Sequence, residues 1–142
     1  MKINTKIRYG LRAMICINNC DNQDGVMQKT IAEDQDLSNK YLDAIIAALK
    51  LKGLITTYRG KGSGYILTRP ASMISMYDIY TAFEPINVVE CLNNPQFCNR
   101  FCECKASDYW GELKRDFIKL LKAKTLEQIA KEDKVHSTSI SN

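Results

Sequence analysis

The cysteines are concentrated in one short stretch of the chain. Four of the six follow the spacing Cys91-x6-Cys98-x3-Cys102-x-Cys104. Such a group indicates metal or redox chemistry, because thiolates are soft ligands for iron–sulfur clusters, zinc or Cu(I), and accessible thiols are readily oxidised. The spacing contains neither the Cys-x2-Cys pair of a zinc ribbon nor a ferredoxin run. An iron–sulfur cluster, zinc, metal-free thiol sensing and purely structural cysteines are therefore all open at this point.

The segments on either side must position this cysteine stretch. Pro95 and the neighbouring asparagines disfavour a regular helix over residues 91–104, so we predict a loop, which lets several sulfurs converge. Residues 105–124 then predict the longest helix, with apolar side chains spaced three and four apart as in a coiled-coil seam. A second copy of the chain would cover this seam in a homodimer, and the alternative is packing against the chain's own core. The seam consists of Trp110, Leu113, Phe117, Leu120, Leu121 and Lys124.

Residues 38–65 have the pattern of a DNA-reading unit. A helix with one buried face is predicted over 38–53, because four apolar side chains recur at spacings of three and four. Ser38 is its expected N-cap and Gly53 its expected end. Two short β-branched and aromatic segments flank a Gly-rich loop and predict a hairpin. The four apolar residues of the helix are Leu42, Ile45, Ile46 and Leu49.

Two further helices are expected ahead of this unit, over residues 3–18 and 27–34. The second of them, the turn at 36–38 and the helix that follows form a helix-turn-helix, whose last helix enters the major groove of DNA. Within the first helix, Arg12 is expected on a solvated face. Cys16 lies in an apolar stretch, so we interpret it as a core thiol.

Contacts to DNA are expected from the start of the major-groove helix and from the hairpin tip. Tyr41 has two interpretations, a phosphate contact or a packing aromatic. Asp43 is repelled by phosphate but can accept a hydrogen bond from a cytosine amino group. The basic, Gly-rich tip can follow a phosphate strand or enter a minor groove. The predicted DNA-binding residues are Ser38, Asn39, Lys40, Tyr41, Asp43, Arg59, Gly60, Lys61 and Gly62.

Charge and composition favour the same class of partner. The 142-residue chain has a net charge of +4, and residues 1–69 hold 11 Lys and Arg against 6 Asp and Glu. A basic N-terminal half indicates a polyanion, here double-stranded DNA. No membrane span and no secretory segment are recognisable, so we expect a cytoplasmic location. Paired catalytic acids and a nucleotide-binding loop are also missing from the sequence, so we do not expect an enzyme.

This chain resembles the winged helix-turn-helix of the Rrf-type family, the IscR/NsrR/CymR group of bacterial regulators, over roughly residues 1 to 130. The resemblance implies a mainly α fold, a winged helix-turn-helix with a small β-hairpin wing and a long C-terminal dimerisation helix. It also implies that the acid at position 43 helps to choose among DNA sites. The matching residues are Lys6, Arg8 and Tyr9, then Ser38, Tyr41 and Leu42, then Arg59-Gly60-x-Gly62-x-Gly64-Tyr65.

The resemblance further implies an iron–sulfur cluster, either 2Fe–2S or 4Fe–4S, held by three cysteines ahead of the dimer helix. Cys98 and Cys104 match those positions, and Cys91 matches with a shift of one. Positions 107 and 8, where family members place or recruit another ligand, hold serine and arginine in this chain. The expected metal ligands are Cys91, Cys98, Cys104 and, for the open fourth position, Cys102.

We therefore expect a DNA-binding transcriptional regulator that senses redox, nitric oxide or iron–sulfur status through a cysteine-ligated cluster. The alternative is a regulator of the same fold without a cluster, responding to a protein, a small molecule or thiol oxidation. The expected organisation is a DNA-binding domain over 1–84, a cysteine-rich cluster-binding loop over 85–104, a dimerisation helix with a short terminal helix over 105–132, and a disordered tail over 133–142.

Overall fold

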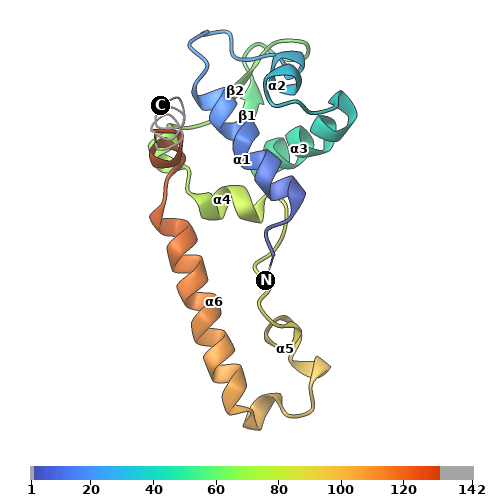
Figure 1. The fold of residues 1–142 in the computed structure, drawn as a ribbon, viewed down its shortest axis with the longest axis vertical. Coiled ribbons are helices and arrows are strands. Elements are labelled where there is room, and N and C mark those ends of the chain that lie inside the picture. Colours follow the sequence, from blue (N-terminus) through green and yellow to red (C-terminus); the bar gives the residue numbers. More distant parts are fainter. Residues whose placement is uncertain (1, 132–142) are drawn as a thin grey trace, which may run out of the picture.

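Three helices and a two-stranded sheet form the N-terminal body, which lies at the top of Figure 1. The computed structural model describes residues 2–131, so the predicted tail over 133–142 lies outside the described residues. The fold is the predicted mainly α arrangement with one small hairpin. The elements are α1 (Thr5–Asn18), α2 (Gln28–Asp34), α3 (Asn39–Lys52), β1 (Ile55–Thr57), β2 (Tyr65–Leu67), the 3-10 turn Ala71–Met73, α4 (Met76–Thr81), α5 (Glu90–Asn93), the 3-10 turns Pro95–Phe97 and Phe101–Glu103, and α6 (Lys105–Ala123).

Helix α3 begins and ends where its sequence predicts. The Ser38 hydroxyl accepts a hydrogen bond from the Tyr41 backbone N–H at 3.2 Å, and Gly53 ends the helix with a φ of 81°. The predicted apolar face is the buried one, and it packs against α1 and the hairpin. Its members are Leu42, Ile45, Ile46 and Leu49.

The turn between α2 and α3 is fastened to α1 by Arg12. This side chain is exposed, as expected, but it is also engaged. Its Nε and Nη2 atoms donate to the side-chain and backbone oxygens of Gln35, each at 2.8 Å. The guanidinium also lies over the Tyr9 ring, 5.0 Å from the centroid. Because Asp36 adopts a left-handed φ of 53°, the chain reverses here and aims the start of α3 outward.

The hairpin is joined to the segment before α2 by a close backbone contact. β1 and β2 pair antiparallel, and Tyr65 forms an additional bridge with Val26, through hydrogen bonds of 2.8 and 3.1 Å. A Cβ atom on Gly64 would lie 2.5–2.8 Å from backbone atoms of the facing segment. Glycine is therefore required at position 64 for the two segments to approach this closely.

Residues after the hairpin return to the body at two places. Leu126 is fully buried in the main core, and its N–H donates to the carbonyl of Ile74 at 2.8 Å. Phe117 of α6 meets Tyr80 of α4 edge to face, with ring centroids 5.9 Å apart. Helix α6 is thus held at its C-terminal half, while its first turns extend away from the body (Figure 1).

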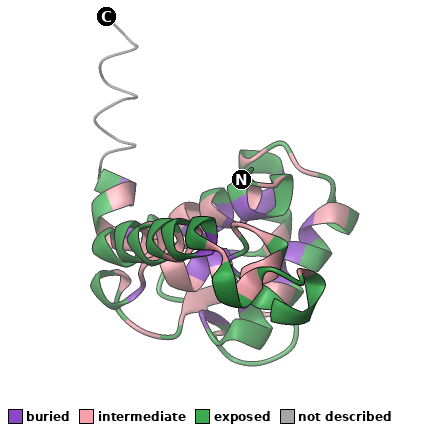
Figure 2. Cartoon of the chain, turned by 90° about the horizontal axis from the view of Figure 1, so that it is seen from below, coloured by how far each residue is buried: buried purple, intermediate pink, exposed green. Residues whose placement is uncertain are grey.

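The apolar stripe of α6 faces two directions. Phe117 and Leu121 are half-buried beside α4, whereas Leu113 and Leu120 remain 36% and 69% exposed. Figure 2 shows the turns of α6 coloured mainly as exposed. Part of the predicted seam therefore packs against the chain's own core, and part is open to solvent. None of the helices over residues 2–131 is long and apolar enough to cross a membrane.

Helix α4 starts with a capping box formed by Ser75 and Asp78. The Asp78 N–H donates to the Ser75 hydroxyl at 3.2 Å, and the Ser75 N–H donates to the Asp78 carboxylate at 2.9 Å. Burial alone would raise the pKa of Asp78, but hydrogen bonds from Ser75 and the Arg69 guanidinium, 3.3 Å away, outweigh it and lower the pKa. The carboxylate therefore stays ionised at neutral pH and keeps the helix start closed.

We expect Gly64→Ala to lower the free energy of unfolding by about 1–3 kcal/mol, because the new methyl group must push apart two backbone segments. Urea denaturation followed by circular dichroism measures the change. The matched control is Gly111→Ala in α6, where the nearest atom is the flexible end of Arg115 at 3.5 Å. There the better helix propensity of alanine should stabilise the chain by up to about 1 kcal/mol. A Gly64→Ala variant as stable as the unsubstituted chain would contradict the close contact.

Candidate nucleic-acid interface and cysteine loop

The start of α3 is accessible, as a DNA-reading helix requires. Asn39, Lys40 and Asp43 are exposed. Together with Lys6 of α1, the first turn of α3 lines a shallow hollow of about 340 Å³. Lys6 and Lys40 therefore bring two positive charges, from two different helices, to the same end of α3, where a phosphate strand would pass beside a helix in the major groove.

Tyr41 differs from the exposed Asn39, Lys40 and Asp43 of α3 because it is half-buried. It meets the ring of Tyr9 edge to face, with centroids 5.7 Å apart and planes at 89°. The ring also packs against the main core. Of the two interpretations of Tyr41, this geometry supports the packing aromatic, and it explains why Tyr9 and Tyr41 occur together.

The wing tip is an exposed and internally braced loop. Gly60 and Gly62 adopt left-handed φ values of 93° and 86° with open space around them. Ser63, which was not among the predicted DNA-binding residues, accepts a hydrogen bond from the Arg59 N–H at 2.9 Å and donates to the Gly60 carbonyl at 2.7 Å. Such hydroxyl–backbone bonds are common in turns. They fix the loop that carries the exposed Arg59 and Lys61.

A groove of about 590 Å³ separates the wing from α2 and α3. Lys61 lies at its wing side and Lys50 at its α3 side, where the ammonium lies over the ring of Tyr65 at 5.9 Å. Gln28, at the first position of α2, also lines it. Neither Gln28 nor Lys50 was among the predicted DNA-binding residues, because their importance comes from three-dimensional position and no local pattern marks it.

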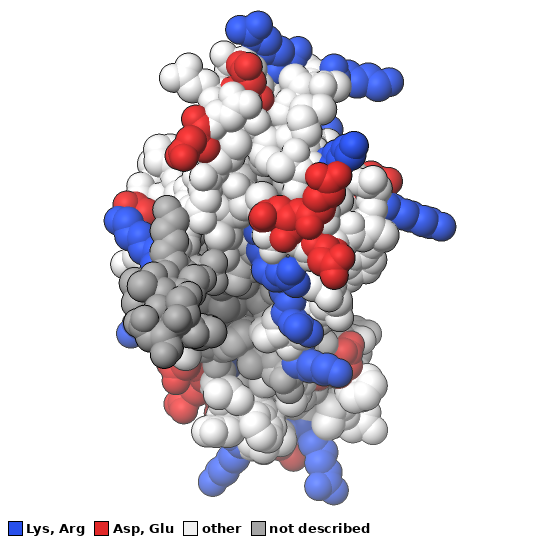
Figure 3. Space-filling view, turned by 45° about the horizontal axis from the view of Figure 1, so that its top comes forward, with Lys and Arg blue, Asp and Glu red and all other residues white. Residues whose placement is uncertain are grey.

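Acidic and basic side chains share the surface of this region. Figure 3 shows lysines and arginines near the upper edge with acidic groups gathered beside them, and no continuous basic face. Any DNA contact would thus depend on particular lysines and arginines at α3 and the wing, rather than on a broad positive potential.

The cysteine stretch forms three short turns, where a loop without regular helix was predicted. Cys91 lies within α5, whereas Cys98 and Cys104 directly follow the two 3-10 turns. Cys102 is exposed and the other three are partly exposed. Within residues 2–131, no three Cys, His, Asp or Glu side chains are arranged so that they could hold a metal ion. The donor types fit an iron–sulfur cluster, but the arrangement of the thiols in this structure does not.

The other two cysteines occupy a different environment. The pKa of the Cys16 thiol is raised to about 11, mainly because the thiol is withdrawn from water. A hydrogen bond with Asp34, the negative charge of Asp34 and the nearby Cys20 raise it further. Cys16 also packs against the main core, as expected of a core thiol. It therefore stays protonated at neutral pH, which makes it a poor nucleophile and a poor metal ligand.

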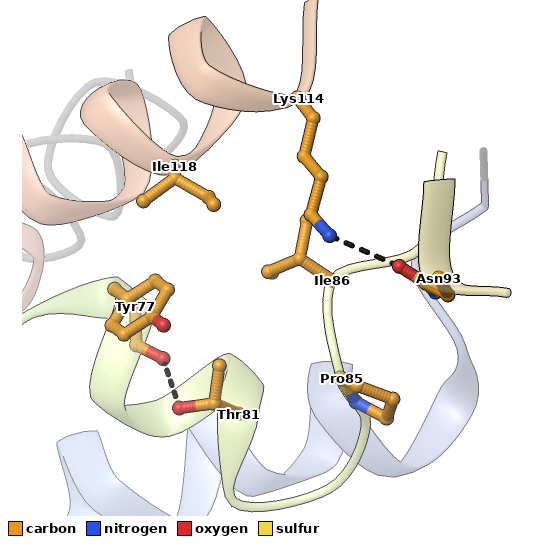
Figure 4. A pocket seen from close by; sticks show the side chains of 7 residues that line it. All are labelled: Tyr77, Thr81, Pro85, Ile86, Asn93, Lys114 and Ile118. Atoms are coloured by element: carbon orange, nitrogen blue, oxygen red, sulfur yellow. Dashed lines mark hydrogen bonds between the residues drawn. The ribbon is translucent and has the colours of Figure 1, made fainter. Parts of the chain in front are cut away.

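A hollow of about 700 Å³ lies between α4, the segment after it, α5 and α6 (Figure 4). Tyr77 and Thr81 line it from α4, and Ile118 from α6. Lys114 of α6 crosses it and donates to the Asn93 side chain of α5 at 3.0 Å. This hydrogen bond connects the cysteine stretch to the helix that follows it.

Comparison with known proteins identifies the family. The family described as "Rrf2: Iron-dependent Transcriptional regulator" matches residues 3–132. The protein named rrf2 of Nitratidesulfovibrio vulgaris is 32% identical over 133 residues, covering 93% of this chain and 89% of that protein.

Solved structures agree. The structure titled "T. potens IscR" has a TM-score of 0.70 at 29% identity and covers 94% of this chain and 88% of that one. The oxidised form of Staphylococcus aureus CymR has a TM-score of 0.68 at 33% identity, with coverage of 92% and 96%. The helix-turn-helix and the wing agree with the family match over residues 3–132, and this chain belongs to the Rrf2 family of transcriptional regulators.

Proposed function

We propose that this chain acts as a homodimer that binds promoter DNA, with α3 of each copy in a major groove and the wing alongside. The observation that supports this most directly is that both the start of α3 and the wing tip are exposed. Lys40 and Arg59 contact phosphates, and Asn39 and Asp43 face base edges. Ser38 caps α3, and Gly60, Lys61 and Gly62 complete the wing contact.

The exposed part of the α6 stripe is the proposed dimer contact. Leu113 and Leu120, with Tyr109 at 57% exposure, form an apolar strip on a helix that is otherwise mostly charged or polar. A second copy related by a two-fold axis covers this strip with its own. The same axis places two α3 helices on successive half-sites, which is how dimeric helix-turn-helix proteins read their operators.

The regulatory signal is proposed to enter through the four cysteines over 91–104. An iron–sulfur cluster is supported by the soft thiolate donors and by the iron dependence in the family description. Cys91, Cys98 and Cys104 would hold it, with Cys102 as the candidate fourth ligand. Bound by these residues, such a cluster would supply an oxidation-sensitive iron centre to this segment.

Thiol oxidation without a metal is the second candidate. It is supported by the exposure of Cys102, by the absence of a converging metal site over residues 2–131, and by the relative solved in an oxidised form. Cys102 and Cys104 are two residues apart within one short segment. Either signal would act on the same segment ahead of α6.

Lys40→Ala and Arg59→Ala should each weaken binding to any duplex. Each loss of a phosphate contact should also reduce the slope of log affinity against log salt by about 0.9. Fluorescence anisotropy with labelled promoter duplex at several salt concentrations measures both quantities. Lys119→Ala, an exposed lysine of α6, is the matched control and should change neither. Equal behaviour of all three variants would contradict the proposed interface.

Protein purified without oxygen should show visible thiolate-to-iron absorbance and contain iron and sulfide. Cys98→Ala and Cys104→Ala should lose all three signals, because each removes a ligand. Cys20→Ala, outside the cysteine stretch, should retain them. Colourless, iron-free protein whose DNA affinity responds to peroxide, and no longer does so as Cys102→Ala, would instead establish the thiol mechanism.

Alkylation should distinguish the half-buried thiol of Cys16 from the exposed thiol of Cys102. At about pH 8, iodoacetamide should modify Cys102 well before Cys16, since a pKa of about 11 leaves little Cys16 thiolate and the core limits access. Raising the pH towards that value should accelerate the Cys16 reaction. Peptide mass spectrometry follows each site, and urea-unfolded chain is the control in which the two react alike. Equal rates in the folded chain would contradict this assignment.

A further inference from the structure

Gln28 connects three parts of the candidate DNA interface. It lies at the first position of α2 and is half-buried at the groove between the wing and the helices. Its Nε2 donates to the Asp43 carboxylate of α3 and approaches the Asn39 carbonyl at 3.4 Å. On its other side, the Tyr65 hydroxyl of β2 donates to its Oε1 at 3.5 Å. A chain of two hydrogen bonds therefore leads from Tyr65 in the wing strand through Gln28 to Asp43 on the base-facing side of α3.

These contacts fix the direction of the Gln28 amide. Because the Asp43 carboxylate can only accept, the NH₂ group of Gln28 must point towards it, and Oε1 then accepts from the Tyr65 hydroxyl on the other side. A hydrogen bond to a charged acceptor is stronger than one between neutral groups, so Asp43 is held in one orientation. The Gln28 amide donates its hydrogen bond to Oδ1 of Asp43, and Oδ2 accepts no hydrogen bond from any group within residues 2–131. An oriented, available carboxylate oxygen is what is needed to accept from the N4 amino group of cytosine.

We propose that Gln28 is a specificity-determining positioning residue: it holds the Asp43 carboxylate so that the start of α3 prefers a cytosine at one position of the operator. This inference rests on the proposed DNA-binding function and deepens it. Without the amide, Asp43 can turn among several rotamers, and its charge repels the phosphates of every sequence alike. Gln28 itself reads no base; it acts through Asp43, while the Tyr65 hydroxyl holds the other end of the amide.

The decisive variant is Gln28→Glu, which keeps the size of the side chain but removes the Nε2 donor and places a second carboxylate beside Asp43. Duplexes are first enriched from a random-sequence pool by the unsubstituted protein, and binding is then measured for every single base-pair change in the enriched site. We expect one cytosine preference to be about 10-fold, within the range for a good base contact. Gln28→Glu should reduce it to less than about 3-fold, leaving preferences elsewhere in the site unchanged.

Three controls separate positioning from a merely structural role. Asp43→Ala should abolish the same preference, and adding Gln28→Glu to it should change that preference no further. Tyr65→Phe, which keeps the ring, should weaken the preference in the same direction but by less. Thermal unfolding should show that each variant remains folded. Rescue is expected with Gln28→Lys, which restores a donor to the carboxylate and with it the cytosine preference.

The outcomes are distinguishable. If Gln28→Glu binds all duplexes more weakly by the same factor, or if it keeps the cytosine preference, the proposed role of Gln28 is overturned while the DNA-binding function stands. An additional loss of preference in the double variant overturns it as well, because Gln28 would then act independently of Asp43. Failure of the unsubstituted protein to enrich any duplex would contradict the proposed function itself.

Discussion

The burial of one face of α3 is the constraint on which the interface depends. Four fully or almost fully buried aliphatic side chains fix the rotation of this helix about its own axis. Once that rotation is fixed, the opposite side, with Asn39 and Asp43, has to face outward. The caps at Ser38 and Gly53 then fix where the helix starts and ends. Neither the wing nor the lysines could compensate for a rotated α3, because every outward-facing side chain of the helix would move together.

Local patterns in the sequence were sufficient for the parts that depend on near neighbours. The apolar face of α3, its two caps and the Ser75–Asp78 capping box all arise from residues three or four positions apart. The fold class followed from the resemblance to the Rrf-type family, part of which is carried by α3 and the Gly-rich wing. Contacts between residues far apart in the chain could not be predicted in this way. The bond from Arg12 to Gln35 joins α1 to the turn after α2, and the bond from Gln28 to Asp43 joins α2 to α3.

The cysteine stretch shows the same limit in another form. Composition alone marks the four thiols as chemically special, and their spacing places them ahead of the longest helix. Convergence on a common centre, however, depends on the path of the backbone, and three short turns replace the predicted loop. The stripe of α6 was recognisable for a similar reason, but periodicity does not specify which partner each side chain meets. Phe117 turned towards Tyr80, and Leu120 remained exposed.

Leu126, just after the C-terminal end of α6, attaches that end of the helix to the body. The helix could therefore pivot about this end, its fulcrum, like a lever. The fulcrum is firm, since backbone hydrogen bonds tie Leu126 to Ile74 and Met76 to Lys124. The helix of 19 residues is about 28 Å long at 1.5 Å per residue, so a 3 Å shift of its free end tilts it by only about 6°. If the thiols were displaced, the helix would turn about its fulcrum, which lies in the same core that orients α3.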